Sequence, residues 1–363
     1  MIQSTGRTVI YENPRPHVRS RHGYFPGLAM LPNGEIVCLF ALGEAFESAD
    51  SRTWVTRSLD AGETWTLEAP VCVGASNDYL KPTTLADGSL LAIGYRFHRE
   101  DPEVGIAIPE TGGIVGGDDI VTRSADGGRT WETPRVIRRP CPELIELSGP
   151  AVELKGGDLI AIGALYKTPD GSSPSGQIGV SLRSTDGGVS WADGGRYFTT
   201  PGANVAPYES RLCEMQAGRL VALSWAYDTS RDQHLPNHVT VSHDEGRTWS
   251  SPLNTGTWGQ ASNLAWLGGD RLLTIHAHRG EDPGLFVRIV DFAGDRWRVL
   301  EETQIYGTAV AQTRAGQSMP EMFKSLRFGQ PSLLQIGDGD FLAVHWCIED
   351  GQGKIRAHRL RAQ

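Results

Sequence analysis

The sequence predicts an all-β protein folded as a six-bladed β-propeller with four-stranded antiparallel blades. Three observations support this prediction. A hairpin pattern, two apolar runs separated by a turn that contains Gly, occurs six times along the chain. A second pattern, Ser-x-Asp-x-Gly-x-Thr/Ser-Trp, alternates with it and occurs four times. No window shows sustained periodicity of 3.6 residues, so few helices are expected.

The six hairpins are predicted from their turns. Asn-Gly, Asp-Gly and Gly-Gly pairs between apolar runs are typical of tight β-turns, because Gly readily adopts a positive φ. The spacing of the copies leaves room for two further strands in each unit, and a ring of such units leaves only short sheet edges. The hairpins are expected over residues 28–40, 83–93, 152–162, 212–223, 264–275 and 333–344.

The second pattern predicts a tight turn, called the Ser-x-Asp turn below. Its Asp accepts hydrogen bonds from nearby backbone N–H groups, its Gly supplies a positive φ, and its Trp anchors the hairpin. The turns are expected at residues 58–65, 124–131, 184–191 and 242–249, with an eroded copy at 291–297. A strand over residues 354–360 is expected to join a blade begun near the N-terminus and so close the ring. Residues 1–363 are predicted to form a single domain.

Composition narrows the classes of function. The 363 residues carry a formal net charge of −9, which argues against a protein that binds duplex nucleic acid. No apolar run approaches the length of a membrane span, and the first residues lack the apolar segment of a secretory leader, so a cytoplasmic location is predicted. The five cysteines are scattered without a Cys-x-x-Cys pair, which is typical of reduced thiols rather than of disulfides or a zinc site.

Ser-x-Asp turns on six blades resemble the Asp-box (BNR) repeats of the sialidase, or neuraminidase, superfamily, and the resemblance covers nearly the whole chain. It implies a carbohydrate-active propeller whose Ser-x-Asp turns lie on the face opposite the active site. By the same resemblance, Glu209 matches the glutamate that polarises the family's nucleophile. Arg279 matches an arginine that grips the carboxylate of sialic acid, and Glu47 or Asp50 matches the family's acidic residue.

Three positions depart from the pattern of that superfamily. Tyr24 stands where the first carboxylate-binding arginine is expected, and Trp225 stands where the second is expected. Gln330 aligns with the tyrosine nucleophile. An arginine that binds a carboxylate through two hydrogen bonds is hard to replace by Tyr or Trp. The resemblance therefore implies a sialidase-like protein that is not a standard sialidase.

Polar and aromatic side chains collect where the strands of each hairpin begin and end. Because a hairpin returns to the face from which it started, these residues are expected to meet on one face, in a mouth. Aromatic rings stack on sugars and charged groups bond sugar hydroxyls, so a small carbohydrate is the expected partner. The predicted substrate-binding residues are Arg21, Tyr24, Asp78, Lys81, Arg96, His98, Trp225, Tyr227, Asp228, Gln260, His276, Arg279, Gln330 and His345.

Hydrolysis of a glycoside normally needs two carboxyl groups. Glu209 is the first candidate, and Asp50, Asp78 and Asp228 compete for the second role. His278 is a further candidate as general acid or base. The predicted function is exo-acting hydrolysis of an oligosaccharide, without a cofactor, although histidines at neighbouring strand ends are also of the type that binds a divalent metal. Two alternatives stay open: a lyase that uses His and Tyr on a uronic-acid sugar, and a carbohydrate-binding propeller without catalysis.

Overall fold

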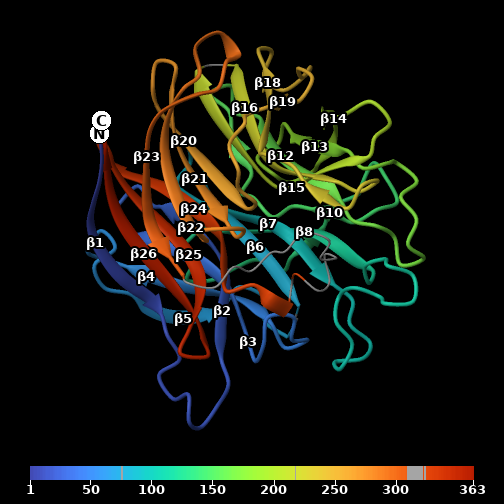
Figure 1. Ribbon diagram of the computed structural model, residues 1–363. Coiled ribbons are helices and arrows are strands. Elements are labelled where there is room, and N and C mark those ends of the chain that lie inside the picture. The colour runs from blue at the N-terminus through green and yellow to red at the C-terminus, as the bar shows by residue number, and fades with distance from the viewer. Residues whose placement is uncertain (75–76, 217, 309–321, 323) are drawn as a thin grey trace.

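Figure 1 shows six antiparallel sheets arranged around a ring in the computed structural model, which describes residues 1–74, 77–216, 218–308, 322 and 324–363. The predicted six-bladed β-propeller is confirmed. The described residues are almost entirely strands, turns and loops, with a 3₁₀ turn, η1, at Ala293–Asp295. No helix in this part of the chain is long and apolar enough to span a membrane.

The first three blades follow one another along the chain. Blade 1 consists of β2 (His22–Met30), β3 (Ile36–Gly43), β4 (Arg52–Ser58) and β5 (Thr66–Pro70). Blade 2 consists of β6 (Asp78–Thr84), β7 (Leu90–Phe97), β8 (Gly117–Ser124) and β9 (Arg135–Val136). Blade 3 has a divided first strand, and its members are β10 (Ile145–Glu146), β11 (Val152–Glu153), β12 (Leu159–Leu165), β13 (Gly179–Ser184) and β14 (Ala192–Phe198).

The remaining blades repeat the same order. Blade 4 consists of β15 (Val205–Gln216), β16 (Arg219–Asp228), β18 (His238–Ser242) and β19 (Leu253–Asn254), with the short β17 (Gln233–His234) paired to β16. Blade 5 consists of β20 (Ser262–Gly268), β21 (Arg271–His278), β22 (Gly284–Asp291) and β23 (Arg298–Gly307). Blade 6 consists of β24 (Phe328–Gly337), β25 (Asp340–Glu349), β26 (Gln352–Ala362) and β1 (Ile2–Tyr11).

The two ends of the chain meet in blade 6. Strand β1 pairs antiparallel with β26, from Ile2 opposite Ala362 to Tyr11 opposite Ile355. The termini therefore lie side by side, as Figure 1 shows. This pairing confirms the predicted closing strand and gives blade 6 an outer strand from the beginning of the chain.

Both predicted repeats occupy turns. All six hairpins join the first two strands of a blade, and their turn glycines have a positive φ, as at Gly34 with 85° and Gly157 with 91°. In the first Ser-x-Asp turn, Oδ1 of Asp60 accepts the backbone N–H of Thr64 at 2.8 Å. The indole of Trp65 donates to the carbonyl of Gly62 at 3.1 Å, so the Trp secures its own turn.

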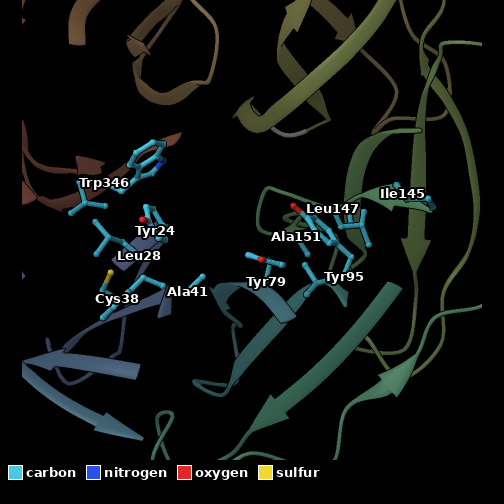
Figure 2. Packing of buried hydrophobic residues seen from close by; sticks show 14 of the residues in the cluster. Tyr24, Leu28, Cys38, Ala41, Tyr79, Tyr95, Ile145, Leu147, Ala151 and Trp346 are labelled. Atoms are coloured by element: carbon cyan, nitrogen blue, oxygen red, sulfur yellow. The ribbon is translucent and has the colours of Figure 1, made fainter. Parts of the chain in front are cut away.

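Inner strands of neighbouring blades contact one another, and aromatic rings pack between some of them. Strand β2 contacts both β6 and β24, and β15 contacts both β12 and β20. Figure 2 shows Tyr24 of blade 1 facing Trp346 of blade 6, with ring centroids 5.4 Å apart, and Tyr79 beside Tyr95 within blade 2. These large buried rings fix the strands from which the candidate site projects.

Candidate active site

Three inner strands share one irregularity. In β2, β15 and β24, two residues stand opposite one residue of the neighbouring strand, which is a β-bulge. The first bulged residue in each strand has a positive φ, 55° at Phe25, 46° at Glu209 and 40° at Gln330. A residue other than Gly pays on the order of 1–2 kcal/mol for this conformation. Backbone strain is therefore concentrated at equivalent positions of blades 1, 4 and 6.

These bulges meet in a hydrogen-bonded chain, and we call the region around it the mouth. The ammonium of Lys81, on blade 2, donates to Oε1 of Gln330 at 2.7 Å and also to the carbonyl of Phe25. The amide of Gln330 donates to Oε1 of Glu209 at 2.6 Å. Lys81 is almost fully buried, and this burial together with the charge of Arg211 holds its pKa well below the usual value. The chain connects blades 1, 2, 4 and 6 at the centre of the ring.

A second carboxyl group adjoins Glu209. Oε2 of Glu146, at the end of β10, accepts the backbone N–H of Glu209 at 3.0 Å. Glu146 is 6 % exposed, and its burial and the negative charge of Glu209 raise its pKa. The buried guanidinium of Arg211 donates to the carbonyl of Glu209 at 3.0 Å and to the hydroxyl of Ser148 at 3.2 Å. The two carboxyl groups thus have different environments, one buried and one half-buried.

A second polar row lies beside this pair. Nη1 of Arg279 donates to Oε1 of Gln260 at 2.7 Å, and Nε donates to the carbonyl of Phe328 at 2.9 Å. The Gln260 amide lies 3.4 Å from Nε2 of His234, whose Nδ1 accepts the indole N–H of Trp225 at 3.1 Å. Burial lowers the pKa of Arg279, and the negative charge of Glu209 partly opposes this shift.

Aromatic rings flank the mouth. Tyr208, the residue before Glu209, lies edge-on to Trp225, with ring centroids 5.6 Å apart. On the blade 2 and blade 3 side, Tyr166 lies edge-on to Tyr95 at 5.8 Å. Carboxyl groups, amides, cations and aromatic rings in one place are the groups that proteins use to hold polar ligands such as sugars.

The structure brings a large part of the predicted site together. Six predicted residues interact directly or through one partner at the mouth, and they are Lys81, Glu209, Trp225, Gln260, Arg279 and Gln330. Tyr227 and Asp228 lie at the end of β16 beside them. The Tyr227 hydroxyl donates to Asp232, while Asp228 accepts the backbone N–H of Ser230 at 3.0 Å and so holds a turn.

The other two predicted catalytic residues make no bond to Glu209. Asp50 is exposed, and its carboxylate accepts the backbone N–H of Glu44 at 3.0 Å. His278 ends β21 and packs against the ring of Phe286, with centroids 6.0 Å apart. Among the described residues, neither forms a hydrogen bond or ion pair with Glu209, so a catalytic role for either has no support from a contact.

Two predicted histidines lie between blades rather than at the mouth. His276 is fully buried, and its ring bonds Ser262 of its own blade and Asn237 of blade 4, both at 3.0 Å. His345 is also buried, and its ring bonds His358 at 3.1 Å. The structure differs here from the expectation of a sugar contact, because both faces of a blade are covered by its neighbours.

The remaining predicted residues have partners within the fold. Arg96 and His98 both bond Asp118, at 3.2 and 2.9 Å, and Arg21 lies over the ring of Trp54 at 5.3 Å. None of these three residues takes part in the hydrogen bonds of the polar chain.

Tyr24 and Asp78 are buried. Tyr24 packs among aromatic rings of blades 1 and 6. Asp78 accepts the backbone N–H of Thr53 at 3.0 Å, and burial raises the pKa of its carboxyl to about 6. Both side chains are therefore part of the packing of β2 and β6 and are not exposed at the mouth.

Two residues of the site are not among the site residues predicted from the sequence. Glu146 is a polar residue just before a predicted hairpin, and many other polar residues occupy the same kind of position. The position alone therefore did not mark it as a site residue. His234 lies in the short strand β17, outside both repeats, and no pattern marks it. Its place beside Trp225 depends on how the chain returns to β16 after the hairpin.

A cleft of about 510 Å³ lies apart from this network, between blades 5 and 6. It is lined by Arg7, Gln304, Ile305, Tyr306, Gly307, Glu349, Arg356 and His358. None of these side chains belongs to the polar chain of the mouth. Within the described part of the protein, no group of three or more His, Cys, Asp or Glu residues is placed to hold a metal ion.

Comparisons with known proteins bear on the fold. No protein-family model matches the sequence, and no curated protein matches it. Solved structures do match. A protein of unknown function from Dyadobacter fermentans superposes with a TM-score of 0.75 at 22 % identity, over 100 % of this chain and 99 % of that one. An α-L-arabinanase from Penicillium chrysogenum, complexed with arabinobiose, has a TM-score of 0.67 at 16 % identity, over 99 % of this chain and 98 % of that one.

Sialidases are also similar in structure. The sialidase of Trypanosoma rangeli, in complex with the inhibitor DANA, has a TM-score of 0.63 at 16 % identity. The match covers 93 % of this chain and 55 % of the sialidase chain, which is therefore the longer of the two. Identities at this level show the fold and not the chemistry. The protein has the sialidase-like six-bladed propeller fold that the resemblance in its sequence implies.

Proposed function

We propose that the protein is an exo-acting glycoside hydrolase that cleaves an oligosaccharide and is not a standard sialidase. The observation that carries this proposal is the contact in which the backbone N–H of Glu209 donates to the carboxyl group of Glu146, which makes two acidic residues neighbours at the centre of a propeller. Structural neighbours with the same fold include an arabinanase and sialidases, which are glycoside hydrolases. Their similarity in fold supports the class of reaction, whereas the roles of individual residues have to be argued from the site.

The roles of the two carboxyl groups follow from their environments. A glycosidase needs one protonated carboxyl group that donates to the leaving oxygen and one carboxylate that acts as base or nucleophile. Burial and the charge of Glu209 favour the protonated form of Glu146, so Glu146 is the acid. Glu209 is half-buried and accepts a hydrogen bond from Gln330, so it serves as the carboxylate.

Gln330 argues against the sialidase reaction. It occupies the position that the tyrosine nucleophile takes in the resemblance, and it contacts the carboxylate of Glu209 directly. A carboxamide donates this hydrogen bond but does not form the aryl glycoside that a tyrosine forms. The neighbouring cation at this point is Lys81, and the positions expected for two arginines hold Tyr24 and Trp225.

Exo action is the mode of cleavage expected from the sequence, and we keep it in the proposal for a mouth whose centre is crossed by hydrogen bonds. Lys81, Gln330 and Glu209 come from blades 2, 6 and 4, and their hydrogen bonds connect these blades directly.

The test is the release of sugar from a broad set of substrates, followed by mass spectrometry. Sialosides, arabinans, rhamnosides and uronates are incubated with the wild-type protein, Glu209→Gln and Glu132→Gln. Glu132 is exposed beside a Ser-x-Asp turn, so its variant makes the same change of charge away from the mouth. Release by the wild type and by Glu132→Gln, lost in Glu209→Gln, supports the proposal. An unsaturated product indicates a lyase, and binding without any product indicates a carbohydrate-binding propeller.

A further inference from the structure

The hydrogen bonds of His234 define which of its ring nitrogens carries the proton. The indole N–H of Trp225 approaches Nδ1 of His234 at 3.1 Å, and an indole nitrogen only donates. Nδ1 is therefore the acceptor and carries no proton. Burial and the charge of Arg279 lower the pKa of His234 to about 4, so the ring is neutral at pH 7. The single ring proton is then on Nε2.

The orientation of the Gln260 amide is also defined. Nη1 of Arg279 lies 2.7 Å from Oε1 of Gln260, and a guanidinium only donates, so the amide oxygen faces Arg279. The NH₂ group consequently faces the other way, toward Nε2 of His234 at 3.4 Å. One of its hydrogens points at the sulfur of Met322 at 3.6 Å, which is a weak acceptor.

Two donors therefore face each other, and the part of the chain that the structure describes places no acceptor between them. The Nε2–H of His234 and an N–H of Gln260 converge at 3.4 Å, and neither nitrogen has a lone pair to offer the other. Turning the Gln260 amide over would only place its NH₂ against the donor Arg279. A single oxygen atom at ordinary hydrogen-bond distance from both nitrogens would satisfy the two donors together, as in an oxyanion hole.

The fold holds this pair rigidly. Arg279 is 3 % exposed, and its Nε donates to the carbonyl of Phe328, so the guanidinium that orients Gln260 is itself fixed. A side chain at Gly329 has no room, because a Cβ there would lie 1.8 Å from Nη2 of Arg279. On the other side, His234 lies nearly parallel to Trp225, with ring planes 25° apart.

The pair also lies beside the proposed catalytic carboxyl groups. Trp225 packs on Tyr208, which precedes Glu209 in β15. Burial lowers the pKa of Arg279 to about 10, and the negative charge of Glu209 acts on the same guanidinium in the opposite direction. An oxygen held between His234 and Gln260 would therefore belong to the sugar whose glycosidic bond lies at Glu209.

We propose that His234 and Gln260 form an oxygen-binding subsite, in which both side chains donate a hydrogen bond to one hydroxyl or carboxylate oxygen of the sugar. The inference rests on the proposed function. It adds a substrate-binding residue, His234, and defines the ligand atom as an acceptor. A sugar that lacks oxygen at this position leaves both donors buried and unpaired, which makes the subsite selective against deoxy analogues.

The first test is the protonation of His234 in the free protein, read by ¹⁵N–¹H correlation of the histidine rings at pH 7. The expected result is a proton on Nε2. A proton on Nδ1 overturns the inference, because the ring would then present an acceptor to Gln260 and the two side chains would satisfy each other.

The second test is kinetic and uses the substrate that the sugar-release experiment identifies. His234→Phe keeps a ring beside Trp225 and removes the donor, and we expect KM to rise about tenfold with little change in kcat. His234→Gln restores an N–H and is expected to recover part of the affinity. His243→Phe, at an exposed ring in a Ser-x-Asp turn, is the matched control. Unchanged KM in His234→Phe overturns the inference.

A failure of the proposed function gives a different result. If the wild-type protein releases no sugar, arabinobiose and N-acetylneuraminic acid are titrated against the labelled protein instead. A change in the His234 Nε2–H signal with either sugar, absent in His234→Phe, supports the subsite in a protein that binds without hydrolysis. No change with either sugar overturns the subsite as well.

Discussion

The backbone N–H of Glu209 donates to Oε2 of Glu146 at 3.0 Å, so the main chain of Glu209 holds the carboxyl group of Glu146. The bond joins the bulge of β15 to the end of β10 and thereby connects blades 3 and 4. It also requires the strained φ of 46° at Glu209 to persist. The position of one carboxyl group therefore depends on the backbone that carries the other.

Replacing Gln330 by Met is expected to lower kcat about tenfold or more. Gln330→Met keeps the size of the side chain but removes the donor to Glu209 and the acceptor for Lys81, leaving two charged groups without one partner each. Gln335→Met, on the same strand but exposed, is the control. Steady-state kinetics with both variants decides the point, and equal rates would show that Glu209 acts without Gln330.

Replacing Ala61 by Gly is expected to stabilise the protein by about 0.5–1 kcal/mol. Ala61 has a φ of 56° in the first Ser-x-Asp turn, while the equivalent residues of two other turns are Gly127 and Gly187. The converse change, Gly187→Ala, should destabilise by a similar amount, because a Cβ there lies 3.6 Å from its nearest neighbour and only backbone strain enters. Urea unfolding measures both, and a loss of stability in Ala61→Gly would contradict the prediction.

Acid is expected to destabilise blade 6 through His358. Burial lowers the pKa of His358 to about 4, below the value near 6.5 of an unfolded chain, so the unfolded state binds its proton first. The contribution of His358 to the free energy of unfolding is therefore fully present above about pH 6.5. It is lost as the pH falls toward 4, by up to about 3 kcal/mol. A variant without a titrating group at position 358 tests this contribution.

His358→Gln offers that comparison, because its amide donates to Nε2 of His345 as the imidazole does. We expect the urea midpoint of the wild type to fall more than that of His358→Gln between pH 7 and pH 4.5. Parallel losses in the two proteins would assign the acid sensitivity to other groups, such as the buried His276, whose pKa burial also lowers.

The fold could be predicted from the sequence because its information is local and repeated. Gly34, Gly88 and Gly157 mark turns whose positive φ few other residues adopt, and the turn at Asp60 contains its own acceptor, donors and Trp. Closure of the ring could be predicted because a strand near each end of the chain was left without a partner, and the two strands do pair.

The site could be predicted only in part, because its geometry depends on contacts between blades. Lys81, Glu209 and Gln330 were predicted from their places at strand ends, but the bonds between them depend on three bulges that no spacing reveals. His276 was expected at the mouth and lies between blades, since alternation along a strand gives two buried faces in a propeller. The proposed role of His234 depends on its contacts with Trp225 and Gln260, which lie elsewhere in the chain.

The roles assigned to Glu146 and Glu209 are tested most directly by the dependence of rate on the leaving group. The substrate found by sugar release is compared with the nitrophenyl glycoside of the same sugar, whose leaving group needs no proton. Glu146→Gln is predicted to lose about 10²–10⁴-fold in kcat/KM on the natural substrate and far less on the nitrophenyl glycoside, while Glu209→Gln loses activity on both. Wild-type rates of Glu146→Gln on the natural substrate would contradict the assignment of Glu146 as the acid.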